Sequence, residues 1–166
     1  AGLVLQAISG LDPNDPTSLP APVPDMIEQA AEGVKGLRIG WDEDYASTDR
    51  DDAYARAVPV GVRVMEQLGA QIVPVKMPER LREYMDAWPV ICSCEAAAAH
   101  AETYPSRADE YGPWFRGWLE NGANHTGVDY ARAQSIRAAC NGELRLTLQG
   151  VDVLALPGSP NSAGQV

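Results

Sequence analysis

Short apolar runs and longer stretches of helical periodicity alternate along this sequence. The runs at 37–41 (LRIGW), 71–75 (QIVPV) and 151–156 (VDVLAL) have the length of strands. We expect the third run to be buried on both faces because it is mostly apolar, whereas Pro74 places the second at a sheet edge or a strand end. Strands that alternate with helices predict an α/β fold with a largely parallel sheet covered by helices.

Helical periodicity fills the intervals between these runs. The pattern predicts helices over 53–68, over 79–104 and from Thr126 to Gly150, with a short aromatic helix that ends at Gly122. Pro59 interrupts the first helix, so we expect a kink or a late start there. Pro89 suits the first turn of a second piece of the next helix, so we expect that helix to be in two pieces. Thr126 is a suitable N-cap for the longest helix, with Asp129 in the first turn.

The first 35 residues differ from this pattern. Leu3, Leu5 and Ile8 repeat like one face of a helix, so the chain opens as the tail of a helix and suggests a piece of a longer protein. Closely spaced prolines exclude a helix over 10–26 and indicate a surface loop. We expect residues 1–166 to be a portion of one domain, with the helix tail and Pro-rich loop over 1–35 and an α/β part with a helical insertion over 36–166.

Composition narrows the class of protein. With 166 residues, 45% of them hydrophobic, the chain can build a sizeable core. Its formal net charge of −10 argues against nucleic acid as a partner. The sequence shows neither an apolar run of the ~20 residues that span a bilayer nor a basic signal-peptide start, and its cysteines lack disulfide spacing. These features predict a cytoplasmic protein with reduced thiols and no membrane partner.

Two clusters of metal-type ligands have simpler interpretations. Cys92 and Cys94 precede Glu95 and His100, but residues two apart on a helix point about 200° away from each other, so the set cannot converge on one zinc ion without unwinding. The acidic run at 42–52 lacks the glycine of a calcium loop, which favours a solvated loop that caps the next helix. We predict no metal site and no cofactor.

No complete catalytic motif is visible in the sequence. Phosphate-binding glycine loops, HEXXH and GxSxG patterns are absent. Ser159 follows a strand, but it lies between Gly158 and Pro160 with no base nearby, and neither Lys35 nor Lys76 has a serine-rich partner segment. The residues therefore predict no catalytic group within the chain.

Loop residues follow each predicted strand, at the edge where parallel sheets bind ligands. These carboxyl ends fall at Trp41–Asp44, Val75–Pro78 and Pro157–Pro160. Ligands of open α/β sheets bind in crevices outside such ends. We therefore expect Gly158 and Ser159, after the last strand, to be the residues best placed to touch a substrate.

An ordered series of short motifs resembles the amidase signature family and covers nearly the whole chain. The matching segments are Gly2–Gly10, Asp12–Ser18 (DPNDPTS), Lys35–Gly40 (KGLRIG), Leu68–Ala70, Glu95–Glu102, Tyr111–Pro113, the set Tyr130, Ala133, Gln134 and Arg137, and Gly150–Pro157. Each motif alone is weak, and the order makes the resemblance specific.

The resemblance implies an enzyme that hydrolyses or transfers amides. Members of the family attack a small-molecule amide with a serine, assisted by a second serine in a cis peptide and by a lysine acting as acid and base. Those groups precede the segment that Gly2–Gly10 matches, so no catalytic residue carries over. The resemblance implies the middle-to-late part of the domain, inactive alone, and it is compatible with a homo-oligomer.

Pocket residues follow from the same resemblance. Tyr111 and Trp118 lie in the region that helps line the pocket in some members, although core packing explains Trp118 equally well. The family usually has threonine where Gly158 stands, so the resemblance does not define the backbone and pocket shape beside Ser159.

Two other functions compete with an amidase portion. One is a free-standing α/β binding or interaction module derived from an amidase, which predicts a start codon just before Ala1. The other is an enzyme that uses Ser159 or a cysteine such as Cys94 in new chemistry. The sequence immediately before Ala1 discriminates the first two, and a hydrolysis assay of the chain tests the third.

Overall fold

A small parallel sheet lies at the centre of the α/β part. The computed structural model describes residues 1–158, apart from the side chain of Tyr54. Strands β1 (Arg38–Trp41), β2 (Gln71–Pro74) and β3 (Val153–Ala155) pair in the order β2-β1-β3, and both pairings are parallel, as predicted. Pro74 is the last residue of β2, and β2 is an edge of the described sheet, which confirms that prediction also.

The exposure of β3 corrects one expectation. Val153 is 42% exposed, and Leu154 and Ala155 are only half-buried, so this strand is not buried on both faces. The reason is its place at the edge of the described sheet, where only β1 pairs with it. Asp152 anchors it to Arg38 through an ion pair of 2.7 Å, and the Arg38 amide donates a hydrogen bond to the Asp152 carboxylate while the Asp152 amide donates one to the Arg38 carbonyl.

Helices make up most of the described chain. They are α1 (Gly2–Ile8), α2 (Met26–Ala31), α3 (Glu43–Ser47), α4 (Asp52–Gln67), α5 (Leu81–Ala99), the 3-10 helix η1 (Ala108–Glu110), α6 (Pro113–Asn124) and α7 (Gly127–Leu148). Thr126 caps α7 in a capping box with Asp129, as predicted. Gly69 follows α4 with φ of +98°, a left-handed conformation that favours glycine, and so ends that helix as expected.

Three helices differ from the sequence pattern. Helix α5 runs unbroken through Pro89, although a proline inside a helix removes one backbone hydrogen bond. Helix α4 begins at Asp52, so Pro59 does not delay its start, and the kink stays a prediction. Packing supports the continuity of α5, because its residues contact both α6 and α7. Helix α2 lies within the range 1–35 where the pattern predicts none after the helix tail, and it begins where the Asp25 side chain accepts hydrogen bonds from two following amides.

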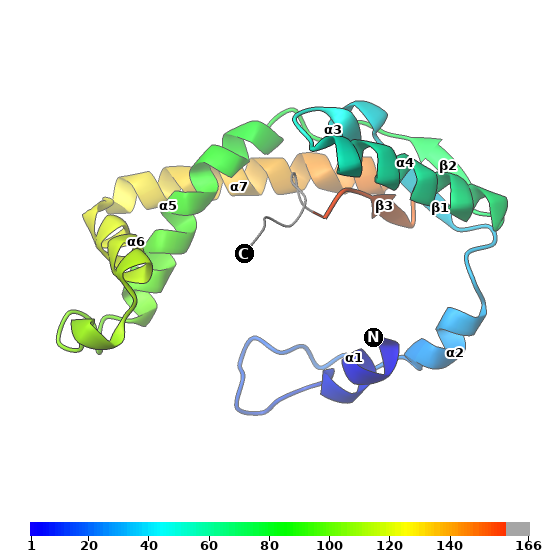
Figure 1. The fold of residues 1–166 in the computed structure, drawn as a ribbon. Coiled ribbons are helices and arrows are strands. Elements are labelled where there is room, and N and C mark those ends of the chain that lie inside the picture. Colours follow the sequence, from blue (N-terminus) through cyan, green and yellow to red (C-terminus); the bar gives the residue numbers. More distant parts are fainter. Residues whose placement is uncertain (159–166) are drawn as a thin grey trace.

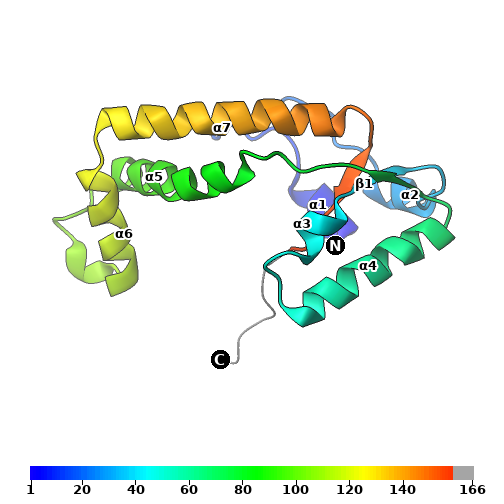
Figure 2. The same ribbon diagram turned by 90° about the horizontal axis from the view of Figure 1, so that it is seen from above.

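The helices form layers around the sheet. Figure 2 shows α7 and α4 on opposite sides of the strands, with α5 alongside α7. Ala87 and Ile91 of α5 pack against Ala133 of α7 in a buried cluster. No helix within the described residues is long and apolar enough to cross a membrane.

Helix α6 packs across α5 at very short range. Gly122 does not end α6, which continues to Asn124. An added Cβ at Gly122 would lie 1.9 Å from the carbonyl oxygen of Ser93 in α5, so only glycine allows this approach. Leu119 and Ser93 are the most deeply buried side chains at this contact.

Candidate functional site

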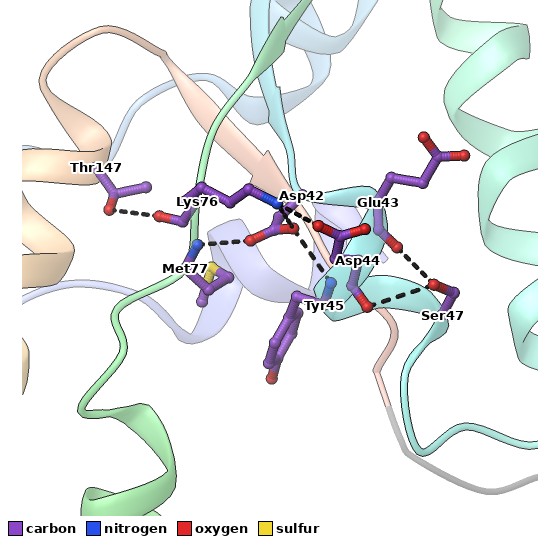
Figure 3. A network of polar contacts seen from close by, with 8 residues as sticks. All are labelled: Asp42, Glu43, Asp44, Tyr45, Ser47, Lys76, Met77 and Thr147. Atoms are coloured by element: carbon purple, nitrogen blue, oxygen red, sulfur yellow. Dashed lines mark hydrogen bonds and ion pairs between the residues drawn. The ribbon is translucent and has the colours of Figure 1, made fainter.

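The carboxyl ends of β1 and β2 meet in a polar network around Asp42. This residue follows β1, caps α3 by accepting a hydrogen bond from the Tyr45 amide (3.2 Å), and accepts a second from the Met77 amide (2.7 Å). Because Met77 lies beyond β2, one carboxylate ties the ends of both strands together (Figure 3). Asp42 is 5% exposed, a burial that acidic side chains adopt when they are paired and hydrogen-bonded.

Lys76 supplies the countercharge for this carboxylate. Its Nζ lies 3.6 Å from Asp42 Oδ1 and forms a closer ion pair with Asp44, while its backbone carbonyl accepts a hydrogen bond from Thr147 Oγ1 of α7 (3.1 Å). The hydrogen bond to Asp44, assisted by the charge of Asp42, raises the pKa of Lys76, so the amine stays protonated and does not act as a base.

The pKa of Asp42 moves in the opposite direction. Burial alone would raise it, because a carboxylate loses hydration inside a protein. The hydrogen bonds from the Met77 and Tyr45 amides, together with the charge of Lys76, outweigh burial and lower the pKa. The carboxylate is therefore a charged structural anchor at neutral pH.

A groove of about 540 Å³ opens beside this network, between α3 and the start of α5. The Arg50 guanidinium lies 5.0 Å from the centre of the Tyr45 ring in the groove wall, and its buried Nε makes no hydrogen bond within the described residues. Leu81 and Met85 add apolar surface. The described lining contains no serine, cysteine or histidine, so the groove offers binding groups rather than an activated nucleophile.

This arrangement corrects the prediction for the acidic run 42–52. Asp51 does cap α4, by accepting a hydrogen bond from the Ala53 amide (2.8 Å). However, Glu43–Ser47 forms helix α3 instead of a solvated loop, and Asp42 is buried. The sequence placed 41–44 and 75–78 at strand ends, and parallel pairing brings those ends side by side, which is the signal that Asp42 would be enclosed there.

Tyr111, a predicted pocket residue, lies in an aromatic and polar cluster before α6. Its hydroxyl is 3.0 Å from His100 Nδ1 and 2.5 Å from Thr103 Oγ1. Its ring stacks on Phe115 with 6.1 Å between the ring centres. These contacts occupy the hydroxyl, and its role in a pocket stays a prediction.

Trp118 and Gly158 lie in different parts of the molecule. The Trp118 ring stacks on Trp114 at 5.7 Å and tilts against Trp88 of α5 at 6.3 Å, whereas Gly158 is exposed after β3. Helix α6 and strand β3 lie at opposite ends of α7 (Figure 1), so the structure does not bring these residues together. Ser159 lies outside the described residues. The pocket roles of all three stay predictions.

The cysteine-containing segment is part of the continuous helix α5. Glu95 accepts hydrogen bonds from the Tyr130 hydroxyl (2.9 Å) and the Gln134 amide (3.3 Å), and so joins α5 to α7. Burial raises the pKa of the Cys92 and Cys94 thiols, which makes them weak nucleophiles at neutral pH. In the part of the chain that the structure describes, no group of three or more His, Cys, Asp and Glu side chains is placed to hold a metal ion.

Comparison with known proteins identifies the family. The family model described as Amidase matches residues 1–166, and the chain belongs to this family. An amidase of Pseudomonas putida is 33% identical over 163 residues, which are 98% of this chain and 35% of that protein. A glutamyl-tRNA(Gln) amidotransferase subunit of Pseudomonas syringae pv. syringae is 31% identical over 188 residues, covering 99% of this chain and 39% of that protein.

Solved structures share the fold. A glutamyl-tRNA(Gln) amidotransferase subunit of Thermotoga maritima has a TM-score of 0.77 and 23% identity, covering 100% of this chain and 36% of its own. A bacterial aryl acylamidase of the amidase signature enzymes has a TM-score of 0.74 and 21% identity, covering 98% and 36%. The helix-covered α/β fold predicted from the sequence is thus confirmed. The chain spans between a third and two fifths of the length of these relatives.

Proposed function

We propose that residues 1–166 form one part of an amide hydrolase of the amidase signature type, and that the catalytic serines and lysine lie outside these residues. The observation that carries the proposal is the family match over the whole chain, at 35% and 39% of the length of two relatives. The site supports it, because Lys76 is paired and protonated and the groove lining lacks a nucleophile with a base. The chain alone is then inactive on amides.

In this proposal the chain supplies sheet strands, their covering helices and one wall of a pocket for a small-molecule amide. Gly158 and Ser159 contribute from the end of the last strand, and Tyr111 and Trp118 from the segment around α6. The proposal places the protein in the cytoplasm and is compatible with a homo-oligomer. The name of the Pseudomonas syringae relative, which is one subunit of an amidotransferase, also supports a partner chain.

An assay of the isolated chain tests its inactivity. The purified protein is incubated with aryl anilides and with aliphatic amides, and product is measured against buffer alone. We expect no hydrolysis above the buffer rate. Turnover that Ser159→Ala or Cys94→Ala abolishes would instead establish an enzyme with its own nucleophile and would overturn the proposal.

The coding sequence before Ala1 tests the rest of the proposal. We expect an in-frame segment rich in serine and glycine that also contains a lysine, and the joined protein should hydrolyse amides. A start codon directly before Ala1, with binding but no hydrolysis, would favour the free-standing module derived from an amidase. A joined protein without amidase activity would also contradict the proposal.

A further inference from the structure

Every large apolar side chain of helix α1 is exposed. Leu3, Val4, Leu5 and Ile8 are exposed by 71%, 65%, 53% and 76%. Neither α1 nor its neighbour α2 contains a buried residue. Figure 1 shows both helices set apart from the layer formed by α5 and α7.

The sequence of α1 is that of a core helix. Its seven residues, GLVLQAI, include no charged side chain. Successive residues of a helix are about 100° apart, so Leu3 and Leu5, which the sequence pattern places on one face, point about 200° apart, with Val4 between them. A helix with apolar side chains on several sides is typical of the interior of a larger protein, whereas a surface helix keeps one polar face.

Little within the described chain stabilises α1. The Gln6 side chain accepts a hydrogen bond from the Met26 amide (3.0 Å), and the backbone of Gly2 faces Ile27. A helix of seven residues is far below the ~12–15 residues at which isolated helices become marginally stable in water. The helix therefore requires cover from elsewhere.

We propose that α1 inserts between elements of the rest of an amidase domain, namely the part of its relatives that this chain does not match. A second copy of the chain would cover one side of α1, but its apolar side chains need cover in several directions. Relatives that align with 98% and 99% of this chain have more than half of their own length outside the match, which provides such cover. This inference rests on the proposed function, and it names α1 as the surface through which the chain contacts the rest of the enzyme.

The experiment measures assembly in trans. The chain is mixed with the portion of the Pseudomonas putida amidase outside its matched region, and complex formation is followed by light scattering and titration calorimetry. We expect a one-to-one complex with the wild-type chain. Ile8→Asp should weaken it at least about 100-fold, because the complex would bury an unpaired charge. Val128→Asp is the matched control, since Val128 is 66% exposed on α7 and an acidic residue suits the first helical turn.

Hydrogen exchange provides a second readout that does not depend on how the variants fold. In the free wild-type chain we expect the amides of α1 to exchange almost as fast as in an unfolded peptide, and to become protected in the complex. The amides of α7 should be protected in both states. Unchanged exchange of α1 in the complex would overturn the inference.

The outcomes separate this inference from the proposed function. Equal affinity of Ile8→Asp and Val128→Asp, or absence of a complex with the wild-type chain, overturns the insertion of α1. A homodimer that Ile8→Asp dissociates makes a second copy the occupant and also overturns it. A complex that depends on Ile8 but hydrolyses no amide supports the inference and contradicts the proposed function.

Discussion

Helices α5 and α6 approach so closely at Gly122 that one methyl group decides their packing. A Cβ at this position would lie 1.9 Å from the carbonyl oxygen and 2.3 Å from the carbonyl carbon of Ser93. Both are backbone atoms in the middle of α5, so no side-chain rotation relieves the overlap. Gly122→Ala therefore forces the two helices apart where Leu119 is 1% exposed.

Two effects of opposite sign compete in this substitution. Replacing a helical glycine by alanine stabilises a helix by about 1 kcal/mol, whereas overpacking a core costs about 1–3 kcal/mol and sometimes more. Because the overlap involves backbone, we expect the cost to be at the upper end, and the free energy of unfolding to fall by about 2 kcal/mol. Gly117→Ala in the same helix is the matched control, since its Cβ meets nothing within 4 Å and should add up to about 1 kcal/mol.

Urea unfolding followed by far-ultraviolet circular dichroism measures both variants. Tryptophan fluorescence gives a second probe, because Trp88 and Trp118 lie at the contact between α5 and α6. The expected result is a lower transition midpoint for Gly122→Ala and a higher one for Gly117→Ala. If Gly122→Ala gained as much stability as Gly117→Ala, the close packing of the two helices would be refuted.

Three further substitutions test other contacts. Gly40→Ala places a Cβ 2.6 Å from Leu154 Cδ2, the flexible end of a half-buried side chain, and 3.3 Å from both methyl groups of Val151, so it should lower the urea midpoint through a loss of only about 1 kcal/mol. Thr126→Ala removes the acceptor for the Asp129 amide and should lower the free energy of unfolding, measured by thermal unfolding, by about 1 kcal/mol. Thr126→Ser keeps a hydroxyl acceptor and should lose only a small part of that stability. The lowered pKa of Asp42 means that its charge stabilises the folded state above the unfolded pKa of about 4, a contribution lost as pH falls through the folded value. Unfolding free energies of wild type and Asp42→Asn should thus differ most near neutral pH and converge in acid, and a constant difference would contradict the contact.

Local sequence signals determined much of the secondary structure. The three strand positions followed from short apolar runs, and the position of Pro74 at the end of an edge strand followed from its missing amide hydrogen. The start of α7 followed from Thr126 and Asp129, and the end of α4 from Gly69. These features depend on residues within a few positions of each other, so the sequence pattern contains the information that decides them.

The candidate site is only partly visible in the sequence. The strand ends at 41–44 and 75–78 are recognisable as places for ligands, but the acidic pattern around Asp42 predicts a solvated loop. Its burial depends on the Met77 amide, 35 residues away, and on the charge of Lys76. The predicted residues Tyr111 and Trp118 have contacts of their own around α6.

The sequence by itself determined the family, the α/β class and the local helix and strand signals, because these depend on motifs and periodicity along the chain. Only the tertiary structure decided that α5 continues through Pro89, that Asp42 joins two strand ends, and that Gly122 lies against Ser93. It also decided which apolar faces are covered, leaving β3 partly exposed and α1 exposed on several sides. The physical reason is that burial and close packing depend on elements far apart in the chain, whereas caps and periodicity act between near neighbours.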